Sequence, residues 1–175
     1  MAQFDVADLR VLIVEDNDHF RALLRTILEA IGVQSIREAR DGDEAMRELQ
    51  DFDASIALVD WKMQNMDGIE CVRQIRSEEG GANPYLPVIM VTAYSDQSLV
   101  QKAQNAGVHE FLGKPITARD LLQSITNVIE RPKSFIKAPD YFGPDRRRRD
   151  LPVSHDERRS EQRFLIPEKE IRTGS

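Results

Sequence analysis

The sequence predicts an α/β domain in which five parallel strands form a doubly wound sheet between five helices. Short apolar runs alternate with stretches of helical period between Leu9 and Ile129, which is the pattern of repeated strand and helix units. Several of these apolar runs are nearly continuous, as expected for strands that helices cover on both faces. With 175 residues, the chain has room for one such domain and an extension.

The first unit is a strand within LRVLIVED, residues 9–16, followed by an amphipathic helix. Gly32 follows this helix as a stop signal. The apolar side chains of the helix recur three and four positions apart, at Phe20, Leu23, Leu24, Ile27, Leu28 and Ile31.

The second and third units continue the alternation. SIREA at 35–39 is a short strand before a helix over 43–50, and ASIALVD at 54–60 is the third strand. A third helix is predicted over 68–79, because the Gly-Gly-Ala-Asn-Pro segment at 80–84 breaks the helical pattern.

The last two units complete the sheet. LPVIMVTA at 86–93 is the fourth strand, and the apolar residues within 99–106 mark a helix that stops at Gly107. The fifth strand is VHEFLG at 108–113, after which Thr117 caps a last helix.

Beyond residue 130 the alternation of strands and helices is lost. Residues 131–175 contain five of the eight prolines and 12 basic against 8 acidic residues, a net charge of +4. Residues 1–130 contain 12 basic and 22 acidic residues, a net charge of −10. We therefore expect one domain over 1–130 and an extended or disordered tail over 131–175, with no separate output domain.

Composition excludes several classes of protein. No apolar run approaches the roughly 18 to 20 residues that a membrane span needs. The N-terminus lacks the basic and apolar segments of a secretory signal, so we expect a cytoplasmic protein without a membrane partner. Cys71 is the only cysteine, which excludes an internal disulfide and indicates a structural thiol.

Charged and hydroxyl side chains stand at the carboxyl ends of four predicted strands, which is where an open parallel sheet binds ligands. They are Glu15, Asp16, Asp60, Thr92 and Lys114. Three clustered carboxylates repel one another unless a cation compensates, and all-oxygen ligands favour Mg²⁺. A metal and a lysine beside a carboxylate suit phosphoryl transfer, and Asp60, alone at a central strand end, is the best candidate nucleophile.

Each of these residues has a simpler explanation when taken alone. A single acid at a strand end is commonly a solvated loop residue that caps a helix, and Thr92 could also be a helix cap. The coincidence of five such residues in one register is what favours a site over five unrelated surface residues.

The chain resembles the receiver (CheY-like) domain of bacterial two-component response regulators over about residues 8–130. VEDN at 14–17 is similar to the acidic pair of that family, and LVDWKMQNMDG at 58–68 to its phosphoacceptor strand and loop. VTA at 91–93 is similar to its switch hydroxyl, and FLGKP at 111–115 to the aromatic residue and lysine of its fifth strand. The resemblance implies a flavodoxin-like sheet with strand order 2-1-3-4-5.

The resemblance also implies roles for single residues. Asp60 would accept a phosphoryl group from a histidine kinase or a histidine phosphotransfer protein, so the protein would not be an enzyme in the ordinary sense. Asp16, Asp60 and the backbone carbonyl of Lys62 would bind Mg²⁺, with Glu15 acting through water.

A switch follows from the same resemblance. Lys114 and Thr92 would bind the phosphoryl oxygens, and Lys114-Pro115 is expected to be a cis bond. Phosphorylation would draw the Thr92 hydroxyl inward with Phe111 following, and so reshape the face of helix four, strand five and helix five. We expect that face to bind a downstream protein or a second copy of the chain.

Some positions depart from the usual family pattern or add to it. Gln64 stands where a proline is usual, which would loosen the loop after Asp60. Lys62 and Tyr94 are expected to line the entry to the site, either changing how water reaches it or without kinetic effect. Trp61 is expected to report phosphorylation through its fluorescence. The three histidines, His19, His109 and His155, are expected at the surface, although His19 could touch the kinase.

The tail offers two alternative outputs. DRRRRD at 145–150 and ERRSEQR at 157–163 could bind nucleic acid through phosphate contacts, but acidic neighbours and the lack of an aromatic platform argue against this. RRSEQRF at 158–164 is similar to the start of a PilZ cyclic di-GMP module through Arg159 and Arg163. No β-barrel sequence follows, so this similarity is either a coincidence or the trace of a truncated output domain.

We expect instead a single-domain receiver with a docked tail. Tyr141 and Phe142 are predicted to anchor the tail on an apolar patch. Acidic surface on this domain or on a partner is predicted to meet the four arginines Arg146, Arg147, Arg148 and Arg149.

Overall fold

A computed structural model of the chain describes residues 4–77, 83–93 and 97–146, and the backbone of 162–164. Five parallel strands form one sheet in the order β2-β1-β3-β4-β5, which confirms the predicted fold class and strand order. The strands are β1 (Arg10–Val14), β2 (Ser35–Ala39), β3 (Ile56–Asp60), β4 (Val88–Thr92) and β5 (Glu110–Gly113).

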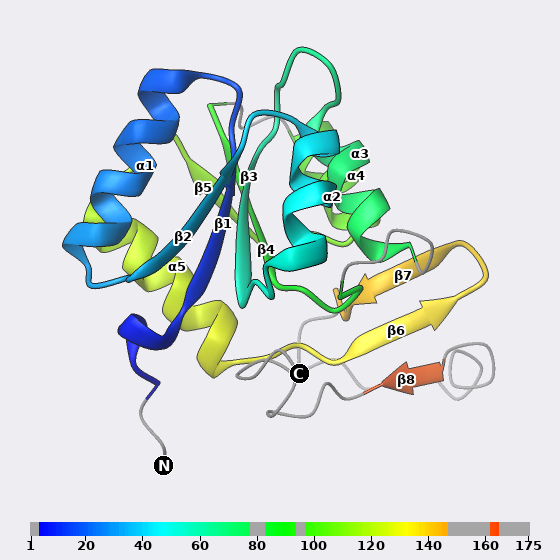
Figure 1. Ribbon diagram of the computed structural model, residues 1–175. Helices are drawn as coiled ribbons and strands as arrows, with labels where there is room; N and C mark the ends of the chain where they lie inside the picture. The colour runs from blue at the N-terminus through cyan, green and yellow to red at the C-terminus, as the bar shows by residue number, and fades with distance from the viewer. Residues whose placement is uncertain (1–3, 78–82, 94–96, 147–161, 165–175) are drawn as a thin grey trace.

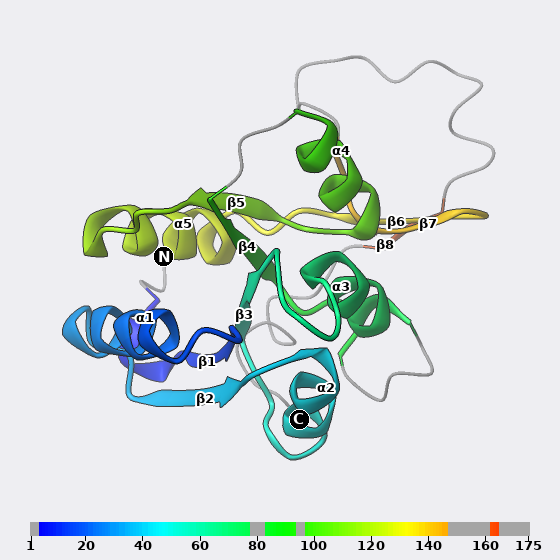
Figure 2. The same ribbon diagram turned by 90° about the horizontal axis from the view of Figure 1, so that it is seen from above.

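Five helices cover the two faces of the sheet. They are α1 (Asp18–Ala30), α2 (Gly42–Asp51), α3 (Gly68–Arg76), α4 (Gln97–Ala106) and α5 (Ala118–Glu130), and a short 3-10 turn, η1 (Val6–Asp8), precedes β1. Helices α1 and α5 lie on one face, and α2, α3 and α4 lie on the other (Figures 1 and 2). The fold is therefore a three-layer sandwich, doubly wound as predicted.

Local signals set the ends of the helices. Asn17 and Thr117 cap α1 and α5 by accepting a hydrogen bond from the backbone N–H three residues further on. Gly32 and Gly107, both predicted as stops, have φ of 107° and 102°, a left-handed conformation that favours glycine. Helix α3 ends at Arg76, earlier than the predicted 68–79, and residues 78–79 lie outside the described residues.

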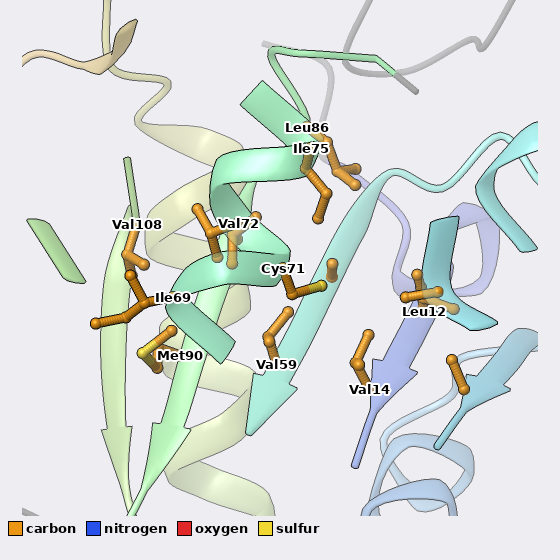
Figure 3. Packing of buried hydrophobic residues seen from close by; sticks show 14 of the residues in the cluster. Leu12, Val14, Val59, Ile69, Cys71, Val72, Ile75, Leu86, Met90 and Val108 are labelled. Atoms are coloured by element: carbon orange, nitrogen blue, oxygen red, sulfur yellow. The ribbon is translucent and has the colours of Figure 1, made fainter. Parts of the chain in front are cut away.

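Two apolar clusters make the core, one on each face of the sheet. Strands β3 and β4 are buried along their whole length, as expected for central strands covered on both sides. Cys71 is fully buried within the cluster beneath α2 and α3, so it is the structural thiol that the sequence predicted (Figure 3). The buried central strands therefore provide a rigid support for the polar residues at their carboxyl ends.

A β-hairpin follows α5 in the stretch that composition alone predicts to be extended or disordered. Its strands are β6 (Phe135–Ala138) and β7 (Tyr141–Pro144), and β8 (Gln162–Phe164) pairs with the other edge of β6. The hairpin lies at the end of the domain opposite to the carboxyl ends of the parallel strands (Figure 1). Phe135 has no exposed surface, so this part of the chain is packed on the domain rather than trailing from it.

A buried cation and a buried histidine lie beneath the hairpin. The Arg76 guanidinium donates hydrogen bonds to the carbonyl oxygens of Pro84, Leu86 and Gly107, and the ring of Phe135 covers it at 5.2 Å. His109 is only 8% exposed and accepts a hydrogen bond from the backbone N–H of Val88 at its Nδ1 atom. The expectation that His109 lies at the surface was wrong, because the hairpin covers it.

The predicted tail contacts lie partly within this layer. The ring of Phe142 packs edge-on against Tyr85 and tilted against Phe135, at centroid distances of 5.5 and 5.4 Å. Arg146 lies over the ring of Tyr141 and donates a hydrogen bond to Asn105 on α4, which is an amide and not the expected acidic partner. Arg147, Arg148 and Arg149, and likewise His155, Arg159 and Arg163, lie outside the residues whose side chains the structure describes.

Among the described residues, no helix combines the length and the apolar character needed to cross a bilayer.

Candidate functional site

The residues predicted from strand ends meet in one hollow of about 270 Å³. It lies at the carboxyl ends of β1, β3 and β4, at the upper edge of the sheet in Figure 1. The residues that line it are Glu15, Asp16, Asn17, Asp60, Trp61, Lys62, Thr92, Ala93 and Lys114. All five residues of the sequence-based site are in this list, together with Trp61 and Lys62.

Glu15 is the most deeply placed acid of the hollow. It is 1% exposed and directly follows β1. Its Oε1 atom accepts a hydrogen bond from the backbone N–H of Asn17 at 3.0 Å, and Arg21 donates to its backbone carbonyl at 2.8 Å. The turn from β1 into α1 is therefore fixed around this carboxylate.

Lys114 bridges two acids that come from different strands. Its Nζ atom lies 3.2 Å from Glu15 Oε2 and 3.0 Å from Asp60 Oδ1. The lysine follows β5 directly, and the bond from Lys114 to Pro115 is cis, as predicted. A single ammonium group thus joins the ends of β1, β3 and β5.

Burial sets the protonation behaviour of the two carboxylates that Lys114 bridges. Desolvation raises the pKa of Asp60 above its ordinary value, and the ion pair with Lys114 opposes that rise. Desolvation likewise raises the pKa of Glu15, with a smaller upward contribution from the charge of Asp60. Lys114 therefore compensates only part of the cost of holding these charges away from water.

The three acids have the composition and spacing of a divalent metal site. One oxygen atom from each of Glu15, Asp16 and Asp60 can be chosen so that all lie within 4.8 Å of one another. All the donors are oxygens, which suits a hard cation such as Mg²⁺. A cation at this position would also stabilise the ionised forms of Glu15 and Asp60, whose pKa values burial raises.

The loop after β3 folds back over the hollow. The backbone N–H of Gln64 donates a hydrogen bond to Asp16 Oδ2 at 3.1 Å, a bond that a proline at this position could not make. A Cβ atom on Gly68 would lie 2.2 Å from the backbone carbonyl oxygen of Asp60, so only glycine allows this close approach. The loop therefore orders Asp16 and is held against the end of β3.

The remaining predicted residues have different positions. Thr92 is 7% exposed and lines the hollow from the end of β4. Phe111 is half-buried on β5, paired in register with Met90, and packs against the core outside the hollow. Trp61 is half-buried and Lys62 is exposed, both at the rim, whereas Tyr94 lies outside the described residues.

Two residues of the site were missed by the sequence reasoning. Asn17 caps α1 and supplies the N–H that binds Glu15. Phe20 lies with its ring centroid 3.9 Å from the Lys114 Nζ atom. Its helical spacing assigned it to the core alone, and no sequence signal shows that a lysine 94 positions later reaches its ring.

Comparisons with known proteins agree with this geometry. A family model described as the response regulator receiver domain matches residues 11–126. Chemotaxis protein CheY-3 of Vibrio cholerae is 32% identical over 124 residues, which are 71% of this chain and 94% of that protein.

Solved structures give the same result. Vibrio cholerae CheY4 matches with a TM-score of 0.64 and 26% identity, over 69% of this chain and 98% of that one. The receiver domain of a Pseudomonas aeruginosa sensor histidine kinase, solved with a magnesium ion coordinated in its active site cleft, matches with a TM-score of 0.61. It is 26% identical and covers 68% of this chain and 95% of its own.

Proposed function

The chain belongs to the response regulator receiver family, and from this premise we propose that Asp60 accepts a phosphoryl group and thereby switches a partner-binding surface. Members of this family are phosphoacceptors rather than conventional enzymes, and their partners are histidine kinases. We propose a phosphohistidine, on a histidine kinase or on a histidine phosphotransfer protein, as the donor for this chain.

The observation that carries the proposal is the Lys114 bridge within the acidic hollow. A carboxylate oxygen of Asp60 would bond to phosphorus while the bond from phosphorus to the histidine nitrogen breaks, and the nitrogen would keep the electron pair. Lys114 Nζ, which lies 3.0 Å from Asp60 Oδ1, would neutralise charge on the incoming phosphoryl oxygens. Thr92, at the next strand end, would be their second contact.

We propose that Mg²⁺ binds at the same hollow. Asp16, Asp60 and the backbone carbonyl of Lys62 would be its ligands from the protein, with Glu15 acting through water. The ion would supply positive charge to the phosphoryl oxygens in addition to that of Lys114.

The switch would act on the face formed by α4, β5 and α5. Thr92 and Phe111 would connect the hollow to that face, since Thr92 ends β4 and Phe111 lies on the neighbouring edge strand. Strand β7 packs against α4, and Arg146 reaches Asn105 near the end of that helix. The hairpin therefore borders the proposed surface, and a downstream protein or a second copy of the chain would meet both.

The domain boundaries stay part of the proposal. We assign residues 1–130 to the receiver domain and 131–175 to an appendage without an output domain of its own. The burial of Phe135 against Arg76 and Tyr85 supports an appendage that is packed on the receiver domain.

Trp61 fluorescence tests the proposal, since this residue directly follows Asp60 and is the only tryptophan. We expect the emission to change when Mg²⁺ is added and to change again with acetyl phosphate or beryllofluoride. Asp60→Asn should abolish the second change. An unchanged signal in wild-type protein that binds Mg²⁺, or the same second change in Asp60→Asn, would refute the proposal.

A further inference from the structure

Lys114 has a third neighbour besides Glu15 and Asp60. The ring of Phe20 lies with its centroid 3.9 Å from the lysine Nζ atom, well inside the distance of about 6 Å at which an ammonium group is attracted to an aromatic face. The neutral ring and the two carboxylates thus hold one ammonium group between them.

Phe20 also has contacts that do not involve the lysine. Phe20 lies in the first turn of α1, where its backbone N–H donates to the capping side chain of Asn17 at 2.9 Å. The ring is half-buried and packs against the apolar cluster beneath α1 and α5. The helix therefore presents a preformed surface to the lysine.

Lys114 lines two hollows, so its ammonium group has more than one direction in which it can point. On one side is the acidic hollow, and on the other is a more open hollow lined by Asn17, His19, Phe20 and Leu23 as well as Lys114 itself. The lysine side chain is 23% exposed and has four rotatable bonds, so its ammonium group could otherwise turn toward water.

We propose that Phe20 is a positioning residue for phosphoryl transfer, whose ring holds the Lys114 ammonium at the acidic hollow. The inference rests on the proposed function of Asp60. Phe20 is not among the residues that line the acidic hollow, and it would act only through Lys114.

The ring has a property that the two carboxylates lack. The charge on Asp60 would change when it becomes an acyl phosphate, and a cation bound at the hollow would compete with Lys114 for the charge of the acids. The ring carries no net charge and binds no hard cation through oxygen, so its attraction for the ammonium group persists through the reaction. Phe20 therefore keeps Lys114 in place when the hold of the carboxylates weakens.

Fluorinated phenylalanines at position 20 test the proposal without changing the packing. Each added fluorine reduces the negative charge on the ring face while the ring keeps its shape and apolar character. We expect the rate constant for phosphorylation by acetyl phosphate, in saturating Mg²⁺, to fall stepwise along the series. The full loss should be about two- to five-fold, the range for a partly exposed cation–π contact. Phe20→Leu should match the most fluorinated protein, and Phe20→Tyr should keep the wild-type rate.

A matched control is fluorination of Phe52, whose ring lies 4.6 Å from Arg10 and 5.3 Å from Arg37 at the end of α2. This series should leave the rate constant unchanged, and Mg²⁺ affinity should stay at the wild-type value in both series. A rate constant that is unchanged or rises along the Phe20 series would overturn the proposal while leaving the function of Asp60 intact. Wild-type protein that takes up no phosphoryl group would instead refute the proposed function, and this inference with it.

Discussion

Phe135 anchors the C-terminal hairpin, and its replacement by alanine is expected to remove a large part of the free energy of unfolding. The side chain is 0% exposed, and its ring centroid lies 5.0 Å from that of Tyr85 and 5.4 Å from that of Phe142. Deleting a phenylalanine side chain from such an environment costs about 3 to 5 kcal/mol. The aromatic pairs and the Arg76 contact each account for about 1 kcal/mol of this.

The loss should be large on the scale of the whole molecule. Domains of this kind unfold with a free energy of about 5 to 15 kcal/mol, so Phe135→Ala should lower the melting temperature by about 10 °C. Burial lowers the pKa of Arg76 to about 9. The smaller alanine side chain at position 135 would admit water next to Arg76 and so relieve some of its desolvation. The expected loss therefore lies nearer the lower end of the range.

Urea unfolding followed by Trp61 fluorescence measures the loss directly. Lys137→Ala, at an exposed position of the same strand, is the matched control and should change the free energy of unfolding by less than about 0.5 kcal/mol. A loss below about 1 kcal/mol for Phe135→Ala would show that the hairpin does not stabilise the domain and would refute this reasoning.

Three other changes test separate parts of the structure. Deleting residues 132–175 uncovers Arg76 and His109 but removes nothing that lines the acidic hollow. We expect a less stable protein that is still phosphorylated, and a folded truncation that takes up no phosphoryl group would contradict this. Because burial raises the folded-state pKa of Asp60 above its unfolded value, ionisation of Asp60 destabilises the fold as pH rises through the raised pKa. In EDTA, the melting temperature of Asp60→Asn minus that of wild type should therefore increase from acid to neutral pH. A difference that stays constant with pH would refute the claim that ionised Asp60 destabilises the fold. Gly68→Ala places a Cβ atom 2.2 Å from the Asp60 carbonyl oxygen and should cost about 1 to 3 kcal/mol and slow phosphorylation. Gly113→Ala, whose Cβ would meet nothing within 4 Å, is its control, and equal losses for the two would contradict the steric argument.

The parallel sheet and its site could be predicted because their signals are local or follow from topology. Buried strands appear as continuous apolar runs, and each run ends where a polar residue begins, as at Val14 to Glu15. Since parallel strands share one carboxyl edge, residues 99 positions apart, such as Glu15 and Lys114, were expected to meet. Gly32 and Gly107 were predictable for a similar reason, because a left-handed backbone conformation after a helix depends on a single residue.

The hairpin could not be predicted in the same way, because what stabilises it is distant in the sequence. The stretch FIKAPDYFGP contains only two short apolar runs around Pro139 and would be a marginal hairpin alone. It is held by Arg76 and Tyr85, whose positions depend on the completed domain. His109 was placed at the surface for the same reason, since no feature near it in sequence indicates the layer that covers it. The contact between Phe20 and Lys114 likewise joins a helix start to a strand end and leaves no periodic signal.

The central claim is that Asp60 is the phosphoacceptor, and intact mass spectrometry with peptide mapping tests it most directly. Wild-type protein incubated with Mg²⁺ and acetyl phosphate should gain the mass of one phosphoryl group on the peptide that contains Asp60. Asp51→Asn, which alters an exposed acid at the end of α2, should gain the same mass, and Asp60→Asn should gain none. No gain in the wild-type protein, or an equal gain in Asp60→Asn, would contradict the claim.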